Sequence, residues 1–198
     1  MKRRFVCLTL LALLIGITFI HLSARAVMAD KAAVVYYDSS KFEPISMIKY
    51  FPLFKVMDQR PSKRIFFGIK RQTIPPGKYF KEGLQDSITQ SSSVIQDDGR
   101  ELQFIIKDFR IVFTKKVRQM SGELRSTIEV DVIIAENGQS IDIGNYKTFY
   151  WNIVGPEVAL TRGIATQDIQ SVLDRNFHKI IEKIFTDKTF IGIVKKTS

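Results

Sequence analysis

Serine and aspartate side chains in the middle of this sequence could serve hydrolysis or metal binding. Ser91-Ser92-Ser93 offers three hydroxyl groups. A serine nucleophile needs an activating base and an oriented setting such as a G-x-S-x-G turn, and no such motif surrounds these residues. We expect them to form a loop. Asp97-Asp98-Gly99 has the composition of a turn and lacks the further oxygen ligands of a calcium loop. We expect this segment to lead the chain into a strand.

His178 is the only histidine after the first 29 residues, and cysteine is absent from the same part of the chain. A zinc site needs several strong ligands, so a half-buried structural role is expected for this imidazole. The sequence therefore predicts a protein that is not an enzyme and that carries no cofactor or metal. A catalytic pair that only folding brings together stays open as an alternative.

Two groups of residues are candidates for binding a partner. Asp58 and Arg60 flank a turn, where they either form a local salt bridge or Asx turn or contact a ligand. The second group is the densest aromatic cluster of the sequence and comprises Tyr146, Phe149, Tyr150 and Trp151. Aromatic side chains usually belong to a core, but an exposed set at a sheet edge would form a binding surface.

The N-terminal 29 residues have the order of a secretory signal peptide. Lys2, Arg3 and Arg4 precede an uncharged apolar run at 5–22, and small residues then offer cleavage sites before residues 27 and 30. Cleavage predicts a periplasmic or secreted protein with a single domain at 30–198. The alternative is an uncleaved inner-membrane anchor, since the apolar run is only slightly shorter than a bilayer-spanning helix.

Charge and cysteine content agree with export. Residues 1–29 hold four of the 30 basic residues and no acidic one, so the remaining chain has 26 basic and 20 acidic residues, a net charge of +6. This surplus favours contact with anionic lipid or lipopolysaccharide, including peripheral membrane contact. The basic residues are dispersed without interleaved aromatics, so no nucleic-acid partner is expected. The only cysteine, Cys7, lies too early in the apolar run to be a lipidation site.

Alternating and apolar stretches predict a sheet. A bulge is expected near Lys107-Asp108, where the apolar positions change phase, and Asn137-Gly138 predicts a tight hairpin turn. The expected strands are 33–37, 50–57, 102–114, 124–134 and a final one from about 140 to 154, and a short apolar stretch at 65–69 follows the turn at 58–61.

Two amphipathic helices accompany these strands. Phe80, Leu84 and Ile88 fall four apart and predict a helix at 78–90, although Gly83 weakens it. Apolar residues at spacings of three and four predict a longer helix ending at Phe185. The order of elements predicts an α/β (α+β) fold, with a small mixed or antiparallel sheet and two helices on one face.

The chain resembles the YajG-type envelope lipoproteins and, more loosely, the LptE-like and PqiC-like auxiliary lipoproteins of lipid transport. The features that carry this resemblance are the strand ending in D-x-R-P at 58–61, the helix at 78–90, the Asp108-Phe109 pair, the strand at 128–134 and the trailing Phe185-Thr186-Asp187. The sequence departs from that family in lacking its lipidation cysteine. The resemblance implies a small α/β sandwich that acts by binding protein or lipid partners.

Three functions follow as hypotheses. The first is an exported, non-enzymatic protein that binds another envelope component, protein or lipid, as an accessory factor of envelope assembly or transport. The second is a structural subunit of a secretion or surface assembly, and the third is an exported hydrolase or lipid-modifying enzyme. A flat aromatic patch would favour a subunit, an apolar groove a lipid binder, and a deep polar pocket an enzyme.

Overall fold

A computed structural model describes residues 37–45, 48–62, 65–67, 72–116, 121–155 and 166–195, all within one compact unit, Val34–Ser198. The expected signal segment 1–29, with Cys7, lies outside the described residues, as does most of the strand expected at 33–37. Tyr37 itself is described and belongs to no strand. Within the described part of the chain, no helix combines the length and apolar character needed to cross a membrane.

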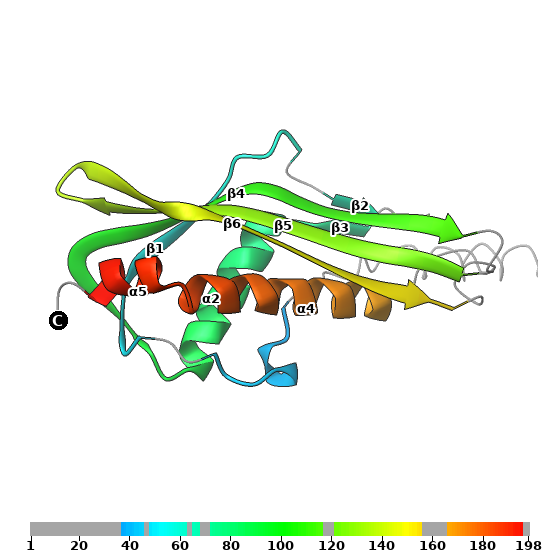
Figure 1. Ribbon diagram of the computed structural model, residues 1–198, viewed down its shortest axis with the longest axis horizontal. Coiled ribbons are helices and arrows are strands. Elements are labelled where there is room, and N and C mark those ends of the chain that lie inside the picture. The colour runs from blue at the N-terminus through cyan, green and yellow to red at the C-terminus, as the bar shows by residue number, and fades with distance from the viewer. Residues whose placement is uncertain are drawn as a thin grey trace, which may run out of the picture. The chain divides into compact units, whose positions relative to one another are not determined.

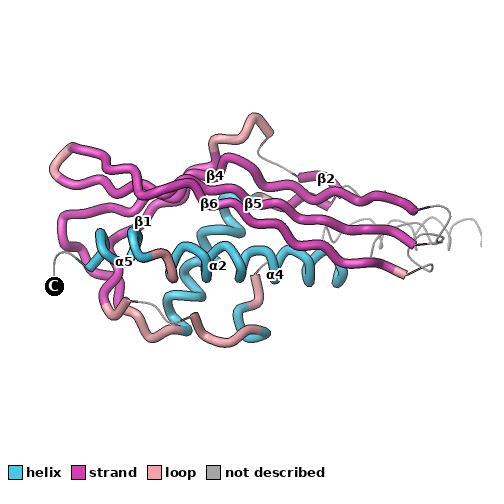
Figure 2. Tube along the Cα trace, viewed as in Figure 1, coloured by secondary structure: helices cyan, strands magenta, loops and turns pink. Residues whose placement is uncertain are grey.

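A four-stranded mixed sheet forms the frame of the unit, in the order β1-β4-β5-β6 (Figures 1 and 2). Its members are β1 (Tyr50–Asp58), β4 (Val94–Lys116), β5 (Ser121–Glu136) and β6 (Gln139–Val154). β1 runs parallel to β4, and the other pairs are antiparallel. A separate two-stranded pair is made by β2 (Ile65–Phe67) and β3 (Gln72–Ile74). β6 is therefore an edge strand of the described sheet.

β4 is longer and more irregular than the sequence indicates. It begins at Val94, so Asp97-Asp98-Gly99 lies inside the strand, and the prediction that this segment leads into the strand is wrong. There the register to β1 jumps, because Gln96 pairs with Pro52 and Glu101 with Leu53. The positive φ of Gly99 (79°) accommodates this excursion. Arg100 then turns inward and donates hydrogen bonds to the carbonyl oxygens of Ile193 and Val194.

Two other local predictions are confirmed. The register of β4 to β5 shifts between Ile106 and Asp108, which leaves Lys107 as the bulge. Asn137 and Gly138 have φ values of 51° and 77° and join β5 to β6, as a tight hairpin requires.

In the described part of the chain three helices, one more than the two predicted, pack on one side of the sheet (Figure 1). They are α2 (Pro76–Gln90), α4 (Thr166–Phe185) and α5 (Lys188–Lys195), and a 3-10 turn, η1 (Ser39–Lys41), precedes β1. The unpredicted α5 buries Phe190 and Val194. Its C-terminal carbonyls accept hydrogen bonds from the guanidinium of Arg100, and the positive charge of this group is stabilised by the negative end of the helix dipole.

Helices α2 and α4 meet at Gly83. A Cβ atom at this position would lie 2.7 Å from Cε1 of Phe177, so the two helices approach more closely than any larger residue permits. Phe177 is fully buried and packs against the rings of Tyr37, Tyr79 and Phe80. The glycine that weakens α2 as an isolated helix therefore makes its packing possible.

Candidate binding site

Three large apolar side chains lie exposed in a row on the edge strand β6. Phe149 is 62% exposed, Trp151 49% and Ile153 58%. They occupy alternate positions, so all three project from the face of the sheet opposite the helices. We call this row the β6 patch. Exposed apolar rows of this kind mark interaction surfaces more often than isolated exposed residues do.

The same alternation separates the aromatic residues that the sequence groups together. Tyr146 is only 3% exposed and belongs to the core, while Tyr150 is half-buried on the helix side of the sheet. Phe149 and Trp151 lie on the other side. The four candidate residues therefore occupy two faces of β6, and only Phe149 and Trp151 share a surface.

The neighbouring strand borders the β6 patch with polar and charged groups. Thr127, Arg125 and Glu123 of β5 lie opposite Phe149, Trp151 and Ile153, respectively. Nη2 of Arg125 donates to Oε1 of Glu123 over 2.8 Å. The patch is therefore an apolar row with a polar border, as in protein interfaces, where a polar rim surrounds an apolar core.

Asp58 and Arg60 form the local structure that the sequence allowed. Nη2 and Nε of Arg60 donate to the two carboxylate oxygens of Asp58 over 2.8 and 2.9 Å, and the backbone N–H of Arg60 completes an Asx turn. Nη1 also donates to the carbonyl oxygen of Phe109, just beyond the bulge in β4. Both side chains thus fasten the end of β1 to β4, and ligand contact by them remains a prediction.

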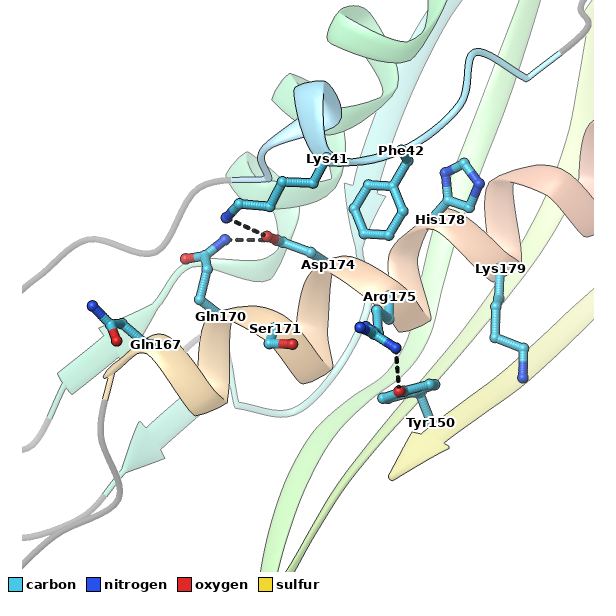
Figure 3. Close-up of a pocket in the computed structure, with 10 residues that line it drawn as sticks. All are labelled: Lys41, Phe42, Tyr150, Gln167, Gln170, Ser171, Asp174, Arg175, His178 and Lys179. Atoms are coloured by element: carbon cyan, nitrogen blue, oxygen red, sulfur yellow. Dashed lines mark hydrogen bonds and ion pairs between the residues drawn. The ribbon is translucent and has the colours of Figure 1, made fainter. Parts of the chain in front are cut away.

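A second surface is an open groove along α4, with a volume of about 690 Å³ (Figure 3). We call it the α4 groove. Its floor is the polar side of α4, and its walls carry Lys41 and Phe42 on one side and Tyr150 of β6 on the other. The helix contributes residues at spacings of three and four, as one helical face must: Gln167, Gln170, Ser171, Asp174, Arg175, His178 and Lys179.

Asp174 is the most buried polar group of the α4 groove. The hydroxyl of Tyr79 and the amide of Gln170 donate to its Oδ1 over 2.7 and 2.6 Å, and Nζ of Lys41 lies 3.8 Å from its Oδ2. Burial raises the pKa of this carboxyl above its ordinary value, against the lowering effect of these hydrogen bonds. Only the fold brings these groups together, because Tyr79 is 95 residues away in sequence.

His178 is half-buried, as the sequence predicts. Its ring stacks on Phe42 with centroids 4.6 Å apart, and its Nδ1 lies 3.3 Å from the hydroxyl oxygen of Tyr37. Burial lowers the pKa of this imidazole, which favours the neutral form near neutral pH. No group of three metal-ligating side chains occurs among the residues that the structure describes.

Comparison with known proteins gives a likeness of fold. Neither a protein-family model nor a curated protein sequence matches the chain. Among solved structures, protein XCC0632 from Xanthomonas campestris, described with the family model DUF330, has a TM-score of 0.50 at 9% identity and covers 81% of this chain and 94% of its own. A minor lipoprotein from Acinetobacter baumannii has a TM-score of 0.43 at 12% identity, over 66% of this chain and 89% of its own.

The Xanthomonas likeness establishes the α+β fold alone, because so low an identity does not carry function, and the lower score adds nothing to it. Neither of these two proteins is named for an enzymatic activity. The fold is consistent with the lipoprotein architecture that the sequence resemblance implies. Membership of a named family remains a prediction.

Proposed function

We propose that this chain is an exported, non-enzymatic protein of the cell envelope that binds another envelope protein through the β6 patch. The observation that carries the proposal is the exposed row of Phe149, Trp151 and Ile153 on an edge strand. A flat aromatic row suits contact with a folded protein, whereas an enzyme needs a concave site with a converging catalytic set.

The edge of β6 adds a second means of attachment. Strands at a sheet edge present unpaired backbone groups to which a partner strand can add, with side-chain contacts giving specificity. Lys183 donates from Nζ to the carbonyl oxygen of Lys147 and so occupies the edge near the middle of β6. The β6 patch lies C-terminal to this point, where a partner can combine strand pairing with contact to the aromatic row.

Site-specific photocrosslinking in a Gram-negative host tests the proposal. A benzophenone amino acid at position 149 or 151 should give a discrete covalent adduct with an envelope protein, which mass spectrometry identifies. The same amino acid at position 50 is a matched control, because Tyr50 is an exposed aromatic residue on the opposite edge strand, β1. Purified partner should then bind the wild-type chain and lose at least tenfold in affinity for Trp151→Ser.

The binding measurement decides the result. Absence of an adduct, equal adducts at positions 50 and 151, or unchanged affinity of Trp151→Ser would each overturn the proposal. Phe149 and Trp151 are both exposed, so replacing either with serine should leave the free energy of unfolding within about 0.5 kcal/mol of wild type. A loss of binding is then a loss of contact and not of folding.

A further inference from the structure

Two cationic side chains in the α4 groove share one aromatic wall and have no acidic partner among the residues that the structure describes. Arg175 and Lys179 lie one helical turn apart, with their charged groups 5.6 and 6.0 Å from the ring centroid of Tyr150. Nη1 of Arg175 also donates to the Tyr150 hydroxyl oxygen over 2.9 Å (Figure 3). Among the described residues, no carboxylate lies within 4.0 Å of either cation.

This arrangement is electrostatically unfavourable for the protein alone. Like charges four residues apart on a helix repel, so an anion placed between them would relieve that repulsion. Asp174 is the single acidic group among the described residues that line the groove, and its Oδ2 lies 3.8 Å from Nζ of Lys41. The groove therefore attracts anions on the Tyr150 side, where its charge is uncompensated.

Aromatic groups give the groove a second chemical character. Phe42 stacks on His178 on the wall opposite Tyr150, and the space between the walls is of the size of small-molecule sites, about 300–1,000 Å³. A ligand that fits both features carries an anionic head and an apolar body. Two cations match a phosphate monoester, with nearly two negative charges near neutral pH, better than a carboxylate with one.

We propose that the α4 groove binds a phosphate-bearing amphiphile, with the phosphate between Arg175 and Lys179 and the apolar part against Phe42 and His178. This inference is independent of the β6 patch, which lies on the other face of the sheet. Arg175 holds the phosphate through its planar pair of N–H donors, and Lys179 supplies a second positive charge. The Tyr150 ring positions both side chains for the anion.

Isothermal titration calorimetry of the full chain tests this site with three defined probes. Dihexanoyl phosphatidic acid should bind. Inorganic phosphate lacks the apolar part, and dihexanoyl phosphatidylcholine lacks the second negative charge on its phosphate, so both should bind at least tenfold more weakly. Arg175→Gln should weaken binding of phosphatidic acid at least tenfold, and Lys179→Gln at least threefold. Raising the salt concentration should weaken binding further.

Matched variants separate this site from general attraction to a basic protein. Lys81→Gln removes one positive charge from the exposed side of α2 and should change affinity less than twofold. Trp151→Ser should bind as wild type, so failure of the proposed protein interface would not affect this result. No binding of phosphatidic acid, equal binding of inorganic phosphate, or equal losses in Lys81→Gln and Arg175→Gln would each overturn the proposal.

Discussion

Replacing Gly83 with alanine tests the close approach of α2 and α4. The new Cβ would lie 2.7 and 2.8 Å from two ring carbons of Phe177 and 3.1 Å from Cβ of Tyr37. Carbon atoms pack best at about 3.5–4.0 Å, so the ring would have to retreat by almost 1 Å. It has no space for this movement, because its neighbours Tyr37, Tyr79 and Phe80 are themselves buried.

The expected cost follows from two opposing effects. Overpacking of a filled core costs about 1–3 kcal/mol, while alanine gains about 1 kcal/mol over glycine in helix propensity. Because the ring is enclosed, we expect Gly83→Ala to lower the free energy of unfolding by about 1–2 kcal/mol, which in a protein of this size lowers Tm by roughly 2–8 °C.

Urea unfolding followed by far-UV circular dichroism measures this change. Gly192→Ala is the matched control, since a Cβ there meets nothing within 4 Å and the same substitution in α5 should raise stability by about 0.5–1 kcal/mol. Combining Gly83→Ala with Phe177→Leu should recover part of the loss. A Gly83→Ala variant as stable as wild type, or a strictly additive double mutant, would refute the close helix approach.

Three further changes test other contacts, each by urea unfolding. Arg100→Met should lower the free energy of unfolding by about 1–3 kcal/mol, because it removes the donor to the C-terminal carbonyls of α5 and the ion-pair partner of Asp98. An unchanged urea midpoint would contradict this cap. Asn176→Ala should also cost about 1–3 kcal/mol, since the buried Asn176 donates to the Ser126 hydroxyl over 2.9 Å, and Ser126→Ala in the same background should then add little. Asp174→Asn should become more stable relative to wild type as the pH rises from about 4. The reason is that burial raises the pKa of the Asp174 carboxyl in the folded state, so its ionisation above the unfolded pKa destabilises the wild-type fold. Parallel pH profiles of stability for the two proteins would argue against this.

Local sequence signals determined the elements whose structure depends on neighbouring residues. The apolar stripe of α4 and the Asn137-Gly138 turn were predicted because helix periodicity and positive φ preferences act over a few residues. The bulge at Lys107 was predicted because the apolar face of a strand changes sides when one residue is inserted. α5 was missed, since eight residues are too few to form a stable helix without the tertiary contacts of Phe190 and Val194.

The tertiary structure decided which predicted surfaces are available for binding. Alternation along β6 separates Tyr146 from Phe149 and Trp151, but only packing of the helices on one face determines which set is buried. Asp97-Asp98-Gly99 lies within β4 because β1 pairs with Gln96 before it and with Glu101 after it, so the strand resumes beyond the unpaired residues. The α4 groove joins residues more than 100 positions apart, so no local pattern reveals it: its charge and its aromatic walls meet only when η1, β6 and α4 pack together.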